Sequence, residues 1–268
     1  MRDIQEILQT GNLRGAIDLA TEHVRNRPTD IPSRSILVEF LCFAGELERA
    51  DKQLDALLRI DPSSMHGVSL LRHLIRAEIS RREVFEQGRI PEFSGPPSES
   101  LQLRLKAAIA LRHNQSADAA ALIEQAGNLE TPLRGTVDGN PFEGFSDLDD
   151  LLGPVLEVFT ATGAYYWIDC AQVQHIEFDP VTHLSDTLWR SASIQTTGGI
   201  DGRIHIPAIY YGSEKSADSR VTLGRTTEWI ASNDNAVTRG AGQREFLLGD
   251  DVLPILNIRN LTFSQDNA

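Results

Sequence analysis

The seven histidines are the residues of this chain most suited to metal binding or proton transfer, and their spacing supports neither role. A zinc site needs three or four converging ligands, and the sequence contains no HxxxH, HExxH or CxxC pattern. Three histidines lie in segments with strand or loop character, and four lie at helical positions: His175, His183 and His205, then His23, His66, His73 and His113. We therefore expect surface or partly buried histidines, and no metal or cofactor.

The cysteines and a group of aspartates are the next candidates for chemistry. Cys42 lies in an apolar helical stripe and is expected in the core. Cys170 directly follows an aspartate, whose charge disfavours the thiolate that a nucleophile requires. Asp147, Asp149 and Asp150 lack the spacing of a calcium loop and are expected at the N-terminus of a helix, where carboxylates match the helix dipole.

Two further segments could bind anions. Gly240-Ala-Gly-Gln-Arg244 superficially resembles a phosphate loop, but it has no lysine and precedes a probable strand, so a tight turn is expected. A basic stretch with interleaved glutamates is expected to form a solvated, ion-paired helix face: Arg72, Arg76, Arg81, Arg82 and Arg89 with Glu78, Glu83 and Glu86. No set of catalytic residues remains, so the chain is not expected to be an enzyme.

An internal repeat with a period of 34 residues organises the first half of the chain. Gly11-Asn-Leu-Arg-Gly-Ala16 aligns with Gly45-Glu-Leu-Glu-Arg-Ala50, and Pro28 aligns with Pro62. This spacing resembles the tetratricopeptide repeat, in which each unit is a hairpin of two helices. The glycines are expected to close the turns, the alanines to allow close helix packing, and the prolines to end the second helices. The repeat positions are Gly11, Ala16, Pro28, Gly45, Ala50 and Pro62.

Later helices extend the repeat to residue 127. A third helix begins near Asp61 and continues through Ile79, and a further hairpin spans Ser98–Gly127 with Gln115 in place of the turn glycine. We expect residues 1–127 to form a tetratricopeptide-like α-superhelix with a groove that receives a peptide or helix. The alternative is that these helices only cap a second domain.

The remainder of the chain is expected to be a smaller, β-rich α+β domain. Residues 128–146 are rich in Gly, Pro and Asn and are expected to form a connector, and residues 147–268 form the second domain. It is expected to begin with a helix capped by Ser146 or Asp147 and extending to Phe159. Strands are then predicted at 164–168, 173–178, 194–197, 203–206, 226–230, 245–248 and 255–258. Many short strands favour a strongly curved or barrel-like sheet, which makes the whole chain an α+β, two-domain protein.

Composition limits the possible partners and compartment. The net charge is −13, and residues 98–268 carry −11 of it, which disfavours binding to nucleic acid. The N-terminus has no apolar segment typical of a secretory signal, and no run of about 20 apolar residues predicts a transmembrane helix. With only two cysteines, a cytoplasmic protein is expected.

A series of short sequence motifs in the second half of the chain resembles the motifs of a known family. In order, they are Asp150-Leu-Leu-Gly-Pro-Val-Leu-Glu157, Tyr165-Tyr-Trp167, Asp186-Thr-Leu-Trp-Arg190, Ile206-Pro-Ala-Ile-Tyr210, Gly212-Ser-Glu214, Arg225-Thr-Thr-Glu-Trp229 and Gly240-Ala-Gly-Gln-Arg244. Together with the repeat, they resemble the ImpE family, also called SciE or TagJ, which are accessory proteins of bacterial type VI secretion systems. The resemblance singles out Gly153, Pro154, Tyr166, Trp167, Trp189, Arg190, Pro207, Tyr210, Glu228, Trp229, Gly242, Gln243 and Arg244.

The resemblance implies a non-catalytic adaptor with one main partner. That partner is the small subunit of the contractile sheath, contacted through one of its helices in the repeat groove. An AAA+ ATPase that disassembles the contracted sheath belongs to the same machinery and would be affected indirectly. No catalytic residues are implied, so the motif positions are expected to serve folding or docking, and the tryptophans to lie in cores.

Two other functions remain open from the sequence. One is an enzyme with a site near Tyr165, Tyr166, Arg244 and the histidines of the β-rich domain. The other is a regulatory scaffold in which the repeat serves a different peptide.

Overall fold

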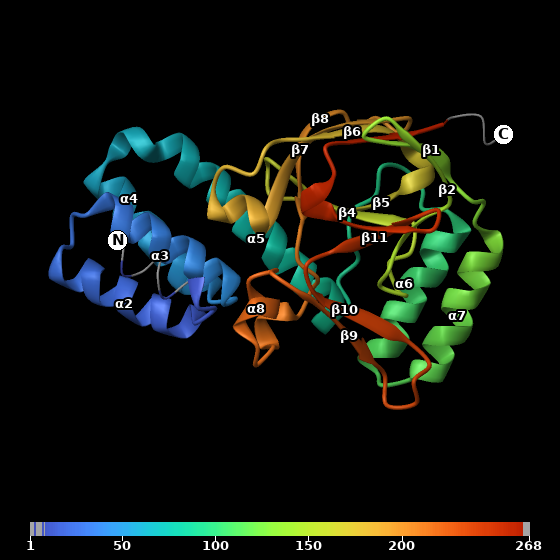
Figure 1. Ribbon diagram of the computed structural model, residues 1–268, viewed down its shortest axis with the longest axis horizontal. Coiled ribbons are helices and arrows are strands. Elements are labelled where there is room, and N and C mark those ends of the chain that lie inside the picture. The colour runs from blue at the N-terminus through green and yellow to red at the C-terminus, as the bar shows by residue number, and fades with distance from the viewer. Residues whose placement is uncertain (1–2, 4–6, 8, 265–268) are drawn as a thin grey trace.

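The computed structural model describes residues 3, 7 and 9–264 of the chain. Helices occupy the first half: α2 (Leu13–Asn26), α3 (Ile31–Phe43), α4 (Leu47–Ile60), η1 (Pro62–Ser64), α5 (Met65–Gln87), α6 (Glu99–Arg112) and α7 (Ser116–Leu129). Figure 1 shows α2–α4 at one end of the molecule and the strands at the other, with α5 extending from one part to the other. The predicted α+β class, with helices first and strands second, is confirmed.

The repeat positions lie at the turns and contacts of the first helical hairpins. Gly11 and Gly45 precede α2 and α4 with φ values of +80° and +71°, which favour glycine. Ala16 and Ala50 are fully buried, as expected for small residues at close helix contacts. The expected first helix of the first unit falls largely on residues outside the described ones.

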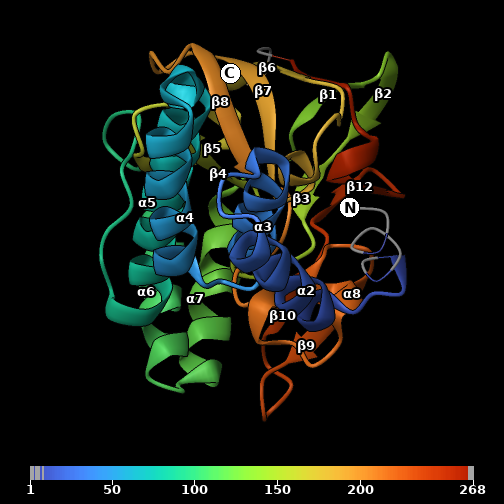
Figure 2. The same cartoon turned by 90° about the vertical axis from the view of Figure 1, so that its left-hand side faces the viewer.

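The α6–α7 hairpin confirms the pair of helices predicted between Ser98 and Gly127. In the described structure, however, it does not continue the row formed by α2, α3 and α4. Figures 1 and 2 place it near the far half of α5, beside the strand-rich part. The side chain of Arg104 fixes this position, since its Nη1 donates to the carbonyl oxygens of Asp150 and Leu151 at 3.0 Å each.

Most strands form one antiparallel sheet of eight, in the order β2-β1-β13-β6-β7-β8-β4-β5. They are β1 (Arg134–Val137), β2 (Asn140–Glu143), β4 (Val155–Thr160), β5 (Tyr165–Asp169), β6 (Val173–Phe178), β7 (Trp189–Thr196), β8 (Gly202–Pro207) and β13 (Asn260–Phe263). Among the described strands, β2 and β5 each pair with one neighbour, so hydrogen bonds do not close this sheet into a barrel.

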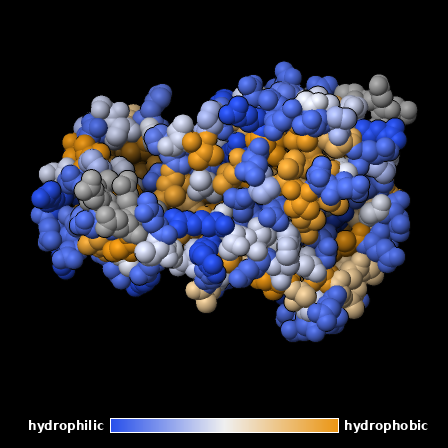
Figure 3. All heavy atoms as spheres, viewed as in Figure 1, coloured by the Kyte–Doolittle hydropathy of each residue, from blue (hydrophilic) through white to orange (hydrophobic). Residues whose placement is uncertain are grey.

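Two smaller sheets complete the fold. One contains β3 (Phe145–Asp147), β11 (Glu245–Leu248) and β12 (Asp251–Pro254), and the other contains β9 (Thr227–Ala231) and β10 (Thr238–Gly242). Short helices η3 (Leu184–Thr187), η4 (Ser213–Lys215) and α8 (Ser219–Thr222) lie in the connections. The face in Figure 3 is mostly hydrophilic, with apolar patches over the strand-rich part.

Side chains on the two faces of β4 pack into two different hydrophobic clusters. Val155 and Phe159 pack in a cluster with the helices, whereas Leu156 and Val158 pack in a second cluster with β3 and β11. Because side chains alternate between the two faces of a strand, β4 has apolar side chains on both faces, with Glu157 as its one charged residue, and it is almost wholly buried.

The predicted helix from residue 147 to Phe159 is wrong. The chain forms β3, then turns through Gly153 at a φ of +52°, and continues as β4. A short apolar run fits a strand buried on both faces as well as it fits a buried helix, and the sequence cannot distinguish them by periodicity. The aspartates are therefore not at a helix N-terminus, and both Asp147 and Asp149 are buried.

The predicted connector and two predicted local features also differ from the structure. Residues 128–146 contain the end of α7, strands β1 and β2, and the start of β3. Asp138 and Gly139 have positive φ, which favours the two-residue hairpin turn between β1 and β2. Residues 255–257 form the 3-10 helix η5 (Ile255–Asn257) after Pro254, and not the predicted strand. Gly240 and Gly242 lie in strand β10 and not in the predicted tight turn.

Candidate functional site

The chain's own C-terminal half covers the face of the helical array formed by α3 and α5. The Ser185 amide donates to Glu39 of α3 at 3.4 Å, and the Trp189 indole donates to Glu78 of α5 at 3.4 Å. Only about 20 Å³ of space remains where these elements meet. Side chains from both halves line it: Cys42, Phe43, Glu78, Arg81, Arg82, Leu188, Trp189, Ile209, Ser213, Glu214 and Thr222.

This covering accounts for the burial of most of the second half of α3. Leu37, Val38, Phe40, Leu41 and Phe43 are all buried. A helix segment that is apolar on most sides is surrounded by protein, and Glu39 is the one charged residue in this part of α3. The α3–α5 face is therefore an internal interface between the two halves of the chain.

A buried charge cluster holds that interface together. Glu157 on β4 accepts from Nε and Nη2 of Arg81 on α5 at 2.7 and 2.8 Å, and its Oε2 also accepts from Arg244. The Tyr165 hydroxyl donates to Glu157 at 2.5 Å, and Arg81 also donates to the Ile209 carbonyl oxygen at 3.2 Å. The cluster thus joins a helix of the first half to β4, β5 and the segments beyond β8.

Burial and charge act in opposite directions on the carboxylates of this cluster. Burial raises the pKa of Glu157, but Arg81 and Arg244 outweigh it and hold that pKa at about 2. At Asp147, burial raises the pKa to about 7 although Arg244 lies within 3.4 Å. Burial and the charge of Glu157 raise the pKa of Tyr165 well above its usual value. Glu157 is thus an ionised partner for two arginines, and Tyr165 a neutral hydrogen-bond donor.

The Tyr210 side chain extends the cluster towards the β9–β10 hairpin. Its hydroxyl donates to Asp147 at 2.8 Å and accepts from the Glu245 amide at 3.0 Å. A Cβ atom on Gly240 would lie 2.4 Å from the Tyr210 ring, so glycine is required there. Asp149 in turn accepts from the Gly240 amide at 3.0 Å and from Arg239 at 2.6 Å.

The motif positions of the second half divide into an internal and a surface group. The internal group consists of Gly153, Trp167, Trp189, Arg190, Pro207, Tyr210, Gly242 and Arg244, all buried, with Pro154, Tyr166 and Gln243 partly buried. Glu228 and Trp229 are exposed on β9, and Trp229 is 42% exposed, so the prediction of a core position is wrong for this one tryptophan. Most of these positions therefore support the fold and its internal interface.

The residues proposed for an enzyme site do not form an accessible one. Tyr165 and Arg244 are buried within the charge cluster. His175 lies on β6, His183 next to η3, and His205 is buried on β8 with an Nδ1 that has no hydrogen-bond partner. Within the described part of the chain, no group of three or more His, Cys, Asp and Glu residues could hold a metal ion.

Both cysteine side chains are buried away from solvent. Cys42 and Cys170 are free and buried, and burial raises the pKa of each thiol above its usual value. The core position predicted for Cys42 is confirmed. None of the described helices is both long and apolar enough to span a bilayer.

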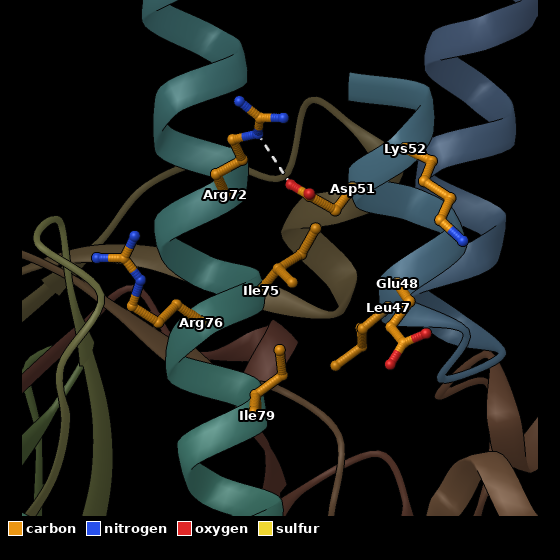
Figure 4. A pocket seen from close by; sticks show the side chains of 8 residues that line it. All are labelled: Leu47, Glu48, Asp51, Lys52, Arg72, Ile75, Arg76 and Ile79. Atoms are coloured by element: carbon orange, nitrogen blue, oxygen red, sulfur yellow. Dashed lines mark hydrogen bonds and ion pairs between the residues drawn. The ribbon is translucent and has the colours of Figure 1, made fainter. Parts of the chain in front are cut away.

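An open groove lies between α4 and α5, outside the internal interface. Its volume is about 630 Å³, and its lining residues are Leu47, Glu48, Asp51, Lys52, Arg72, Ile75, Arg76 and Ile79. Figure 4 shows Leu47, Ile75 and Ile79 between the two helices, below the contact of Arg72 with Asp51. Arg72 Nε lies 2.8 Å from Asp51, and Arg72 also pairs with Asp55, so ion pairs join α5 to α4 at one end of the groove.

Sequence reasoning missed both the charge cluster and this groove. The basic stretch was expected to be a solvated helix face, yet Arg81 and Glu78 are buried, whereas Arg76 is exposed. The one available signal was Glu157, an acid within the apolar run of residues 155–159. The groove arises where two helices meet, and its lining combines positions 47–52 with positions 72–79.

Comparison with known proteins agrees with this architecture over nearly the whole chain. The family model described as "ImpE protein" matches residues 139–262. The chain is 30% identical to the type VI secretion system accessory component TagJ of Pseudomonas aeruginosa, over 98% of this chain and 92% of that protein. It also matches the X-ray crystal structure of a protein from Vibrio parahaemolyticus with a TM-score of 0.92 and 27% identity, covering 99% of this chain and 98% of the other. This chain therefore belongs to the ImpE family.

Proposed function

We propose that this protein is an accessory component of a type VI secretion system that acts by binding and not by catalysis. The observation that carries the proposal is the full-length likeness to the TagJ accessory component. The burial of Tyr165 and Arg244 supports a non-catalytic role, because neither side chain can meet a substrate. We place the protein in the bacterial cytoplasm.

The partner that we propose is the small subunit of the contractile sheath, bound through one of its helices. A protein with an open groove between two helices can accept a third helix along it. Binding there would modulate sheath assembly or recycling, and would affect the sheath-disassembling AAA+ ATPase only indirectly. A regulatory scaffold for other proteins is the competing function.

Calorimetric titration of the full-length chain with the purified small sheath subunit of the same gene cluster tests this proposal. We expect saturable one-to-one binding with a Kd in the micromolar range, which corresponds to about −8 kcal/mol. The large sheath subunit alone serves as the comparison and should give no heat of binding. No binding of the small subunit at roughly 100 μM, where even a weak complex of about −5.5 kcal/mol would form, would favour the scaffold function.

A further inference from the structure

We infer that the free edge of strand β9 is a dimerisation surface, and that its occupant is β9 of a second copy of this chain. The inference goes beyond the proposed function, because it does not depend on the sheath partner. It also gives a reason for the exposure of Trp229, a motif position at which a core side chain was expected. Figures 1 and 2 show the β9–β10 hairpin projecting from the bottom of the molecule.

The backbone of β9 has one unpaired edge. In the described part of the chain, β9 pairs with β10 and with no other strand. The Gln243 amide donates to the Thr226 carbonyl oxygen at 3.2 Å, so residues 226, 228 and 230 present their backbone groups to β10. Successive residues of a strand face opposite edges, and the N–H and C=O groups of Thr227, Trp229 and Ala231 therefore point to the free edge.

Other strand edges of this fold are protected. β2 contains Pro141, β12 ends in Pro254, and Glu92 forms two hydrogen bonds with the edge of β5, at 2.9 and 3.0 Å. The outer edge of β10 donates to Asp149 and Ser213 at 3.0 and 2.7 Å. Among the described residues, β9 has neither a proline nor a hydrogen-bonded segment at its free edge. Because an unprotected edge is a template for another strand, this one is suited to strand pairing.

The side chains of β9 are also unusually apolar for an exposed edge. Trp229 is 42% exposed and Ile230 is 56% exposed, and they lie on opposite faces of the hairpin. The Trp229 ring packs edge-on against Tyr210, with 5.8 Å between the ring centroids, which holds it in place on its face. A strand added to this edge would contact apolar side chains on both faces.

Symmetry selects a second copy of β9 as the occupant. When two identical strands pair antiparallel about a two-fold axis, the residue at the axis lies opposite its own copy. With Trp229 at the axis, Thr227 lies opposite Ala231 of the other copy, and every N–H and C=O group on the two free edges forms a hydrogen bond. An axis at any other residue of β9 leaves some of these groups unpaired. The free edge is thus complementary to itself in one register.

The side chains agree with that register. The two Trp229 rings lie next to each other on one face, where a cross-strand aromatic pair is favourable. On the other face, Glu228 lies opposite Ile230 of the other copy, so that no two like charges within β9 are directly opposite.

The charges at the two ends of the strand are complementary as well. Arg225 precedes β9 and Asp234 follows it, and both are exposed. Their hydrogen bonds include the Gln9 carbonyl oxygen and the Ser116 hydroxyl, and neither residue forms an ion pair within the described part of the chain. Antiparallel pairing brings Arg225 of each copy to the end where Asp234 of the other copy lies, which favours this orientation.

Light scattering of the full-length chain over a concentration series tests the inference. We expect a monomer–dimer equilibrium with a Kd in the micromolar range. Trp229→Glu places two carboxylates opposite each other at the axis and is expected to weaken dimerisation at least tenfold. Val252→Glu is the matched control, because Val252 is 49% exposed on the edge strand β12 and the charge change is the same.

A mixture of two variants separates lost pairing from lost folding. Trp229→Glu and Trp229→Lys are each expected to be monomeric alone, because each puts two like charges at the axis. Mixed in equal amounts, they are expected to form a heterodimer, since opposite charges then meet there. A variant that failed to fold could not be restored in this way.

Ala231→Pro tests the backbone pairing without changing the tryptophan. The Ala231 N–H points to the free edge, so its loss leaves the hydrogen bonds between β9 and β10 intact. Dimerisation is expected to weaken at least tenfold, while the circular dichroism spectrum stays that of the wild-type chain.

Several results would overturn the inference. One is a wild-type chain that remains monomeric at roughly 100 μM, where a complex of micromolar Kd would form. A dimer that Trp229→Glu leaves unchanged, or a mixture of the Glu and Lys variants that stays monomeric, would also overturn it. If the wild-type chain is monomeric and Trp229→Glu abolishes binding of the small sheath subunit, a strand of that subunit and not a second copy occupies the edge.

Discussion

Replacing Glu157 by Gln is expected to lower the free energy of unfolding by about 3–5 kcal/mol, because it leaves two buried arginines without their shared counter-charge. Glu157 is fully buried between Arg81 and Arg244, and Gln keeps the size of the side chain while removing its charge. The loss is large beside a typical total stability of about 5–15 kcal/mol. Urea unfolding followed by tryptophan fluorescence measures it, since Trp167 donates to Tyr165 at 2.5 Å next to the cluster.

Glu143→Gln is the matched control for this variant. Glu143 on β2 also pairs with an arginine, Arg134, but both side chains are more than 60% exposed. An exposed pair contributes about 0–1 kcal/mol, so this variant should be close to wild type. Equal and small effects of the two substitutions would show that the buried cluster does not hold the halves together.

Residues 1–129 produced alone are expected to keep helical content but to lose fixed tertiary packing. Truncation removes Leu188, Trp189 and Ile209, which pack against α3 and α5 in the intact chain. Each large apolar side chain returned to water costs about 1.5–3 kcal/mol, which a small helical array cannot offset. Near-ultraviolet circular dichroism and a thermal melt measure the outcome, with the full-length chain as reference.

A fragment that melts cooperatively near the transition of the full chain would contradict this expectation. It would show that the helical array is an independent domain despite its internal interface. If the fragment loses its packing, binding experiments require the full-length chain, because the isolated array would present an uncovered α3–α5 face that the intact protein never exposes.

The helical half was largely predictable because its signals are local. The 34-residue period, the turn glycines and the small residues at helix crossings all act within one or two neighbouring helices. The same reasoning anticipated α6 and α7 as a hairpin. It did not anticipate their position beside the strands, which depends on the contact of Arg104 with residues 150 and 151, more than 40 positions away.

The strand-rich half was predicted less well because burial on both faces removes the alternation that identifies a strand. β6 was predicted with its observed bounds, since polar and apolar residues alternate along it. β4 was predicted to be a helix because apolar side chains lie on both of its faces. The Asp138-Gly139 turn was the local signal that could have identified the β1–β2 hairpin.

The candidate site was the least predictable part of the molecule. A repeat groove was expected on general grounds, but the covering of α3 and α5 depends on segments 184–189 and 209–222. Arg81 and Arg76 belong to one basic stretch in the sequence, yet one is buried against Glu157 and the other is exposed at the groove. The sequence alone does not distinguish these two arginines, because their burial depends on which segments of the second half pack against α5.

Photocrosslinking of the full-length chain inside bacteria that assemble the secretion system tests the central claim most directly. With a photoreactive leucine analogue incorporated, illumination is predicted to give a covalent adduct of this protein with the small sheath subunit, identified by mass spectrometry. Bacteria that lack the small sheath subunit are the control and are predicted to give no such adduct. The absence of an adduct with the small sheath subunit, in bacteria whose sheath subunits crosslink to one another, would contradict the proposed partner.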